Sequence, residues 1–268
     1  MNILILSPHR DDAAFSLAFS ISSWLSAGHQ VTVVNAFTLS LYAPYSDADS
    51  VHENDRRSYI SAMRKREDQA FLKKMPRLEM IDLKLKDAPI RLRCESSSVC
   101  AMQMPISDSA IAKIRKALDE LAGDDGESCL VLPLALGRHV DHRVAREAAI
   151  PLSVKFPCAF YEDLPYAMRE GARTDLTELL ESSKTLLQQR LRPVLCSSRE
   201  TRPSGWKADI ALLYSSQIDR PLAEAMASFS ERYGGSERLW ANDAWIKVAA
   251  AKRLSELSGE SVEAQLPE

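Results

Sequence analysis

Two continuous apolar runs separated by a helical segment constrain the fold of this chain more than any other feature. Residues 2–7 and 30–37 are apolar on both faces, which is typical of parallel strands that helices cover on both sides. Between them, residues 13–27 have apolar positions at helical spacing, and Gly28 follows, a residue that often ends a helix. Together these segments predict a βαβ unit with a right-handed crossover.

The rest of the chain continues this alternation of strands and helices. Further strands are expected at residues 77–85, 128–134, 157–163 and 193–198, and helices at residues 55–74, 107–122, 141–151, 174–190 and 205–217. From Pro221 onward we expect helix, with a short irregular piece at residues 237–240. The predicted fold class is α/β: a Rossmann-like, three-layer α/β/α arrangement with a mostly parallel sheet. We expect a single domain over residues 1–258 and a polar, frayed tail at 259–268.

The composition of the 268 residues narrows the classes of partner. Lys and Arg number 34 and Asp and Glu number 37, and the resulting net charge of −3 argues against a nucleic-acid partner. No apolar stretch approaches the roughly 18 residues that a membrane span needs. The N-terminus lacks a signal-peptide pattern, and five scattered cysteines form no C-x-x-C pair, which favours a cytoplasmic protein. The composition leaves the oligomeric state, including a homo-oligomer, open.

Charged and imidazole side chains gather directly after two of the predicted strands. His9-Arg10-Asp11-Asp12 follows the first strand, and the segment 137–142, GRHVDH, follows the strand at 128–134. In open parallel sheets the ligand site lies outside the carboxyl ends of the strands. The two clusters are therefore expected to face one crevice, although about 130 residues separate them in the chain.

A metal ion would compensate the adjacent carboxylates of the first cluster. His9 and Asp12 are three residues apart at the start of a helix, so both side chains can point the same way, and His142 could supply a third ligand. Two imidazoles and one carboxylate with an open position are typical of a catalytic zinc site. Zn²⁺ is the metal predicted, and Fe²⁺, Mn²⁺ or Co²⁺ remain alternatives for such a ligand set.

The remaining polar residues of the two clusters suit acid–base work. Asp11 would act as general base on a water, and His139 would donate a proton or a hydrogen bond to the developing oxyanion. Asp141 would hold one of the histidines in the required tautomer. Taken alone, Asp11 or Asp12 is more typical of a helix N-cap, and each histidine of an ordinary core or surface position. The hypothesis depends on the two clusters meeting.

The same residues resemble the signatures of a known family. Residues 7–13, SPHRDDA, resemble the PHxDD signature of the LmbE-like, or PIG-L-type, N-acetylglucosaminyl de-N-acetylases, and residues 137–142 look like their HxDH signature. Weaker similarities at Arg66-Glu67, at 161–166 and at 207–217 extend the resemblance to about residue 220.

The resemblance implies a set of roles and a reaction. It implies that His9, Asp12 and His142 bind zinc, that Asp11 is the general base, and that His139 stabilises the oxyanion or acts as the acid. The implied reaction is hydrolysis by zinc-activated water of an N-acyl group, usually acetyl, on a small amino-sugar-like or glycosylated metabolite. The implied partner is thus a small N-acylated molecule.

Two departures from the family signatures alter the rim of the site. Ala13 stands where many members have Glu, and Arg10 stands where many have Pro. We expect Arg10 to point towards the mouth and bind an acidic substrate group, and the alternatives are a solvated arginine or one paired with Glu162 or Asp163. The common sugar substrates of the family are therefore not assumed for this chain.

Further substrate-binding candidates come from segments next to the predicted strands. Glu162 and Asp163 follow a strand, so one of them is expected to position a loop or a substrate hydroxyl, with a surface role as the alternative. Arg64 is a candidate on a strongly basic helix whose face could equally be solvated. Tyr42 and Tyr45 lie on the loop 38–54, which could close as a lid or simply pack.

Three competing functions are weaker. A nucleotide-binding Rossmann protein would need G-x-G-x-x-G after the first strand, where this chain has carboxylates that would repel a pyrophosphate. An aspartyl phosphotransferase would need Asp in place of His9. A non-catalytic relative that binds a small ligand in the same crevice stays open, although the intact Asp11 argues against it. The sequence therefore predicts a zinc-dependent N-deacetylase or amidase.

Overall fold

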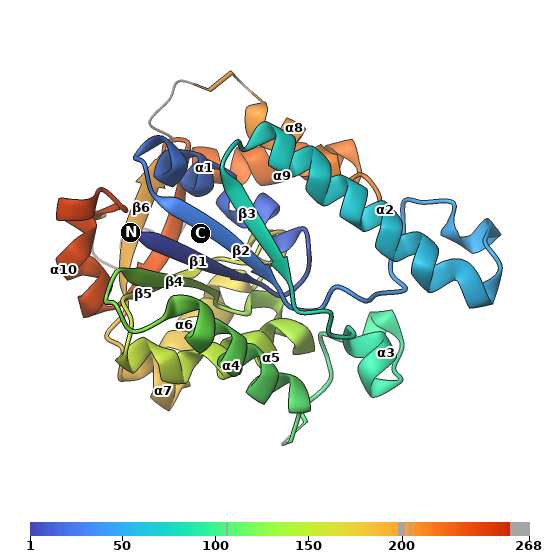
Figure 1. Cartoon of the computed structure of the whole chain (residues 1–268), viewed down its shortest axis with the longest axis horizontal. Coiled ribbons are helices and arrows are strands. Elements are labelled where there is room, and N and C mark those ends of the chain that lie inside the picture. Colours follow the sequence, from blue (N-terminus) through green and yellow to red (C-terminus); the bar gives the residue numbers. More distant parts are fainter. Residues whose placement is uncertain (106, 198–201, 204, 258–268) are drawn as a thin grey trace.

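Five parallel strands form the half of the sheet that carries the N-terminal motif in the computed structural model (Figure 1). The structure describes residues 1–105, 107–197, 202–203 and 205–257. In spatial order the strands are β3 (Leu78–Asp82), β2 (Gln30–Asn35), β1 (Asn2–Ser7), β4 (Ser128–Pro133) and β5 (Cys158–Tyr161). Because β1 and β4 are neighbours, the segments that follow them leave the sheet side by side.

The other half of the sheet is antiparallel. β7 (Ser236–Ala241) pairs antiparallel with both β5 and β6 (Arg192–Ser197), and the short β8 (Glu256–Leu257) pairs antiparallel with β6. Within the described residues the sheet has eight strands in the order β3-β2-β1-β4-β5-β7-β6-β8. The prediction of a mostly parallel sheet in a single α/β domain is confirmed.

Helices cover both faces of the sheet, which confirms the three-layer arrangement (Figure 1). One layer holds α1 (Asp12–Ser26), α2 (Glu53–Lys74), α8 (Trp206–Ala211), α9 (Arg220–Glu231) and α10 (Asp243–Lys252). The other holds α4 (Ser109–Ala122), α5 (Val140–Ala149), α6 (Ala172–Ser182) and α7 (Lys184–Leu187), and the short α3 (Ala88–Leu92) lies beside it.

The position of β1 between two layers of helices explains why its sequence is apolar throughout. Ile3 and Ile5 pack into the core against α1, whereas Leu4 and Leu6 pack into the core against α4 and α5. All four are almost fully buried, and each such side chain contributes about 1.5–3 kcal/mol to stability. A strand with water on one face would alternate instead, so the continuous pattern follows from the two helical layers.

The prediction of an irregular piece at residues 237–240 is wrong, because these residues belong to β7 in the interior of the sheet. The strand starts with Ser236, Glu237 and Arg238, which hide the usual apolar pattern of a buried strand. All six residues of β7 are nevertheless buried, because Glu237 pairs with Lys207 and Arg238 pairs with Glu162.

Three segments differ from the prediction in where helices begin and end or in whether a helix is present. The helix expected at 174–190 is divided at Ser183 into α6 and α7, and the one expected at 205–217 becomes α8 followed by a 3₁₀ turn, Leu212–Tyr214. The segment expected as a loop at 86–106 contains α3 and a 3₁₀ turn. The 3₁₀ turns elsewhere are Ala48–Ser50, Leu136–Arg138, Ile150–Val154 and Tyr166–Met168.

The structure bears on the predictions about a membrane span and about the redox state of the cysteines. Within the described ranges, each helix is too short or too polar to cross a bilayer. The five cysteines are unbridged thiols, and the cytoplasmic location stays a prediction. The expected frayed tail, 259–268, lies outside the described residues.

The buried carboxylate of Glu237, in β7, accepts hydrogen bonds from α1 just after a break in that helix. The helix leaves helical geometry at Leu17, where φ is −131° and ψ is 19°. Glu237 Oε1 accepts the Phe19 N–H at 3.1 Å, and Oε2 accepts the Ser20 N–H at 2.8 Å and the Ser20 hydroxyl at 2.7 Å. Lys207, also buried, donates to the same carboxylate. Glu237 thus ties α1 and α8 to the sheet.

We predict that Glu237→Ala lowers the free energy of unfolding by about 3–5 kcal/mol, because it leaves Lys207 charged and unpaired in the core. The matched control is Glu231→Ala at the exposed end of α9, which should change stability by less than about 0.5 kcal/mol. Urea denaturation followed by circular dichroism measures both values. A loss for Glu237→Ala no larger than that of the control would show that this carboxylate does not hold α1.

Candidate metal centre

The two predicted clusters meet at the carboxyl ends of β1 and β4. His9 and Asp12 follow β1, and His142 lies in the first turn of α5, which follows β4. Asp12 Oδ2 lies 3.4 Å from His9 Nδ1 and 3.4 Å from His142 Nε2. One ligand atom from each of the three residues lies within 4.8 Å of the others, which is close enough for one cation to contact all three.

His142 has a buried nitrogen without a partner. Its Nδ1 donates to Asp163 Oδ1 at 2.7 Å, so in the neutral ring Nε2 carries a lone pair. Within the described part of the chain this Nε2 has no hydrogen-bond partner, and it faces a carboxylate oxygen of Asp12. Two acceptors that face each other in a buried position require a proton or a cation between them. The residues present therefore fit a divalent metal ion.

The pKa shifts of His9 and Asp12 also indicate that this site favours positive charge. Burial by itself would lower the pKa of His9, but the carboxylates of Asp12 and Asp141 outweigh it and raise this pKa to about 10. Burial would raise the pKa of Asp12, but His142 and His9 outweigh it and lower this pKa to about 2. Protons on the imidazoles balance the carboxylates here, and a bound cation would replace them.

Asp141 holds His9 from the side away from Asp12. Its Oδ2 contacts His9 Nε2 at 3.1 Å and accepts the Ala88 N–H at 2.8 Å, while Oδ1 accepts from Arg91 at 2.7 Å. The carboxylate is fully buried, and its partners fix both oxygens. This arrangement leaves His9 Nδ1 facing Asp12, as expected of a carboxylate that orients a metal-binding histidine.

Asp11 is held by an arginine from α2 and not by the helix that it precedes. Asp11 occupies the N-cap position of α1, but its side chain makes no capping hydrogen bond, so the N-cap alternative is wrong for this residue. Its Oδ1 instead accepts from Arg64 Nη2 at 2.7 Å, and Arg64 is buried. Both residues line the same pocket as the candidate metal ligands.

His139 places a hydrogen-bond donor beside the candidate ligands. Its Nδ1 accepts the backbone N–H of Asp141 at 3.1 Å, so a neutral ring carries its hydrogen on Nε2. Burial, and then the charges of His9 and His142, lower the pKa of His139 well below its usual range. Its ring centroid lies 4.9 Å from that of His9 and 5.1 Å from that of His142.

The expectation that Arg10 points towards the mouth of the site is wrong. Arg10 is buried and pairs with Asp68 of α2 and with Asp82 of β3, whose Oδ2 lies 2.6 Å from Arg10 Nη2. It is therefore neither solvated nor paired with Glu162 or Asp163. The two aspartates come from segments more than 50 residues away, so the local sequence does not reveal this direction.

The expectation that Glu162 or Asp163 positions a substrate hydroxyl is wrong, whereas the alternative that one of them positions a loop is confirmed for Asp163. Asp163 is completely buried behind His142, where it accepts from that ring and from the Leu136 N–H at 3.1 Å. Glu162 points away from this pocket and accepts from Arg238 at 2.6 Å. Neighbours in a strand face opposite sides of the sheet, so the two carboxylates beyond β5 separate.

A cavity of about 440 Å³ lies over the cluster. Its walls come from the segments after β2, β3 and β5, and they include the half-exposed Tyr42 together with Val99, Cys100 and Tyr166. Tyr166 packs on the backbone of Gly137, where an added Cβ would lie 2.5 Å from Tyr166 Cδ1. The sequence analysis includes Tyr166 only within the similarity at 161–166 and assigns it no role, because its partner is a glycine backbone.

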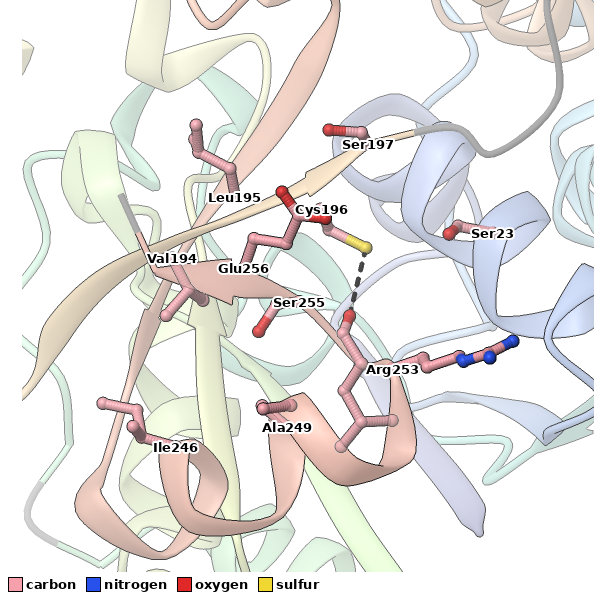
Figure 2. A pocket seen from close by; sticks show the side chains of 12 residues that line it. Ser23, Val194, Leu195, Cys196, Ser197, Ile246, Ala249, Arg253, Ser255 and Glu256 are labelled. Carbon is pink, nitrogen blue, oxygen red and sulfur yellow. Dashed lines mark hydrogen bonds between the residues drawn. The ribbon is translucent and has the colours of Figure 1, made fainter. Parts of the chain in front are cut away.

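A second cavity of about 440 Å³ lies between β6, β8 and α10, and Figure 2 shows its lining. Its walls include Val194, Ile246 and Ala249, and the thiol of Cys196 donates to the Leu254 carbonyl oxygen at 3.3 Å. Among the described residues, the His, Cys, Asp and Glu groups that could hold a metal all lie at the other site. Within those residues, the candidate metal ligands are therefore concentrated beyond the ends of β1 and β4.

Two curated relatives are similar to the chain over most of its length. A 2'-N-acetylparomamine deacetylase of Streptomyces fradiae is 26% identical over 194 residues, covering 69% of this chain and 64% of that protein. A 2'-N-acetylparomamine deacetylase of Niallia circulans is 26% identical over 187 residues, covering 61% of this chain and 66% of that protein. The chain thus spans just under two thirds of the length of these relatives.

Solved structures share the fold, and a family match covers both motifs. A deacetylase of the teicoplanin biosynthesis pathway matches with a TM-score of 0.63 and 22% identity, over 90% of this chain and 97% of that chain. The A40926 pseudoaglycone deacetylase Dbv21 matches with a TM-score of 0.60 and 21% identity, over 91% and 97%. Residues 4–153, more than half of the chain, match the PIG-L family, described as GlcNAc-PI de-N-acetylase. The chain therefore belongs to the GlcNAc-PI de-N-acetylase (PIG-L) family.

Proposed function

We propose that this chain is a metal-dependent hydrolase that removes an N-acyl group, most simply acetyl, from a small amino-sugar-like or glycosylated metabolite. The observation that carries the proposal is the unpartnered Nε2 of His142, which faces Asp12 in a pocket that also holds Asp11. Family membership and the two relatives described as N-acetylparomamine deacetylases support the same chemistry.

The proposed metal ligands are His9 Nδ1, a carboxylate oxygen of Asp12 and His142 Nε2. A divalent cation bound there would polarise the acyl carbonyl and lower the pKa of a water that it binds. Zn²⁺ suits two imidazoles and one carboxylate, and Fe²⁺, Mn²⁺ and Co²⁺ are the alternatives. One structural neighbour is described as the zinc-inhibited form of teicoplanin deacetylase, so the metal must be tested at equimolar and at excess concentration.

Asp11 is the proposed general base. Its Oδ1 accepts from Arg64 Nη2 at 2.7 Å, which fixes the position of the carboxylate in the pocket. Asp11 would take one proton from the attacking water as the oxygen bonds to the acyl carbon. The same proton would then pass to the departing nitrogen as the C–N bond breaks, which yields a carboxylic acid and a neutral amine. The acid would lose its remaining proton to the amine, so that the final products are a carboxylate and an ammonium group.

His139 and Asp141 have supporting roles in this proposal. His139 would donate from Nε2 to the oxygen that gains negative charge, because its Nδ1 already accepts from the backbone. Asp141 would keep His9 oriented through the contact to Nε2. Arg10, Glu162 and Asp163 take no part in binding the substrate, for the reasons of geometry given above.

The pocket over the metal centre suits a sugar-like ring. Its walls combine the rings of Phe15, Tyr42 and Tyr166 with the polar groups of Ser97 and Gln217. Its volume of about 440 Å³ lies within the range of small-molecule sites. Aromatic faces can pack on the C–H side of a sugar, and hydroxyl and amide groups can bind its hydroxyls. A non-catalytic ligand-binding role is less well supported, because it leaves the Asp11–Arg64 pair without a purpose.

We predict that Asp11→Asn retains the bound metal but lowers deacetylation about 10²- to 10⁴-fold, because asparagine keeps the shape and cannot take the proton. Amine release from a panel containing N-acetylglucosamine and 2'-N-acetylparomamine measures the rate, and elemental analysis measures the metal. The matched control, Asp209→Asn on the exposed side of α8, should keep the parental rate. If the metal-loaded Asp11→Asn variant hydrolyses as fast as the control, Asp11 is not the base.

We predict that Asp163→Ala weakens metal binding about 10- to 100-fold, because His142 loses the acceptor that fixes its tautomer and direction. Competition with a fluorescent chelator for Zn²⁺, Mn²⁺ and Co²⁺ gives the affinity without any need for a substrate. The control, Asp209→Ala on the exposed side of α8, should bind metal like the parent. Equal affinities of a folded Asp163→Ala variant and the control would count against the proposed ligand set.

A further inference from the structure

A separate cavity of about 360 Å³ lies on the other side of the segment that follows β5. We call it the arginine-rich cavity. Leu164 to Tyr166 line the metal pocket, whereas Ala167 to Thr174 line the arginine-rich cavity, and Arg169 lines both. The rest of its wall comes from Leu136 and from the end of α9 and the start of β7, at Phe229, Tyr233 and Arg238. The segment 164–171 is thus a wall that the two cavities share, and the arginine-rich cavity has no role in the proposed hydrolysis.

Positive charge predominates around this cavity. The charged side chains that line it are four arginines and two glutamates, namely Arg169, Arg173, Arg232, Arg238, Glu162 and Glu170. Both oxygens of Glu162 already accept hydrogen bonds, Oε1 from Arg238 and Trp240 and Oε2 from Tyr233. Arg238 and Glu162 balance each other's charge, so the remaining charge at the cavity includes Arg169 and Arg232 set against Glu170.

Arg238 is a buried cation with unused donors. Only 5% of its side chain is exposed, and its Nε donates to Glu162 at 2.6 Å. Neither of its two terminal nitrogens donates to any atom of the described residues. Its guanidinium lies 4.7 Å from the Tyr233 ring centroid and 5.2 Å from the Trp240 ring centroid, so the aromatic rings hold it in place. A buried guanidinium fixed in this way favours an acceptor with negative charge.

Two further features favour an anion in the same cavity. The first turn of α6, an 11-residue helix, lines it at Ala172, Arg173 and Thr174, and the N-cap Gly171 gives this turn no side-chain cap. Helix N-termini bind anions through free N–H groups and the helix dipole. In this turn the Ala172 N–H already donates to the Arg169 carbonyl oxygen at 3.0 Å, and Asp175 is the acidic residue of the turn. Arg232 lines the cavity with its guanidinium 5.2 Å from the Phe229 ring centroid, and it makes no ion pair with a described carboxylate.

We propose that this cavity binds an oxyanion, a carboxylate or phosphate group, between Arg238, Arg232 and the first turn of α6. The group could belong to a free anion, or to the substrate whose acyl group lies in the metal pocket, since Arg169 contacts both cavities. The binding site itself does not depend on the proposed hydrolysis. Only the assignment of the anion to the substrate rests on that function.

The binding experiment needs no activity. Inorganic phosphate and acetate are titrated by calorimetry into the full chain, as purified and after removal of metal with a chelator. The parent is expected to bind phosphate saturably in both forms, and Arg232→Gln is expected to weaken binding about tenfold, the loss of one charge-assisted pair. Arg232 is preferred to Arg238, because removal of Arg238 would also unpair the buried Glu162.

The matched control is Arg66→Gln, which removes the same charge from an exposed position on α2. It should leave phosphate binding unchanged. The site is overturned if the parent binds no phosphate saturably after metal removal, or if Arg66→Gln and Arg232→Gln weaken binding equally. The second outcome would show that phosphate responds to the overall charge of the protein and not to this cavity.

A kinetic arm then separates the two sources of the anion. If the anion belongs to the substrate, Arg232→Gln raises KM about tenfold for N-acetylglucosamine 6-phosphate, leaves KM for N-acetylglucosamine unchanged, and phosphate competes with the phosphorylated substrate only. If a free anion is the ligand, phosphate still binds the substrate-saturated protein, and Arg232→Gln changes neither KM. Both outcomes keep the site and differ only in its ligand.

Discussion

The parallel pairing of β1 with β4 is the constraint on which the candidate metal centre depends. Asn2 to Ile5 lie opposite Ser128 to Val131, so both strands reach the same edge of the sheet in register. A slip of one residue would turn each side chain of a strand to the opposite face. His9 and His142 would then no longer approach the same carboxylate oxygen of Asp12. The apolar packing of both faces of β1 therefore also sets the geometry of the polar cluster beyond it.

Buried negative charge is the second constraint, and it explains why the cluster is built from pairs. Asp12, Asp141 and Asp163 are all buried, and each contacts a histidine. A buried carboxylate without a partner would cost several kcal/mol, so the imidazoles must carry protons or share a cation. Because protons and a metal ion compete for the same nitrogens, metal affinity at such a site falls as the pH falls.

The sequence predicts those parts of the site that depend on strand ends, and it misses those that depend on distant partners. His9, Asp12 and His142 were expected to meet because each follows a strand of one parallel sheet. Arg10 follows the same strand, yet Asp68 and Asp82 draw it away from the pocket. The interior strand β7 was missed for a similar reason, since Lys207 and Glu162 neutralise its charged start and no local apolar pattern marks it.

The segment 164–171 lies between the metal pocket and the arginine-rich cavity and contributes to the walls of both. Its first residues form a wall of the metal pocket, and Tyr166 rests against Gly137 in the turn that precedes His139. Its last residues lead into α6 and line the arginine-rich cavity. A shift of this segment would move Tyr166 and Arg169 together. Because both cavities share Arg169, a group bound in one is positioned by the same backbone that shapes the other.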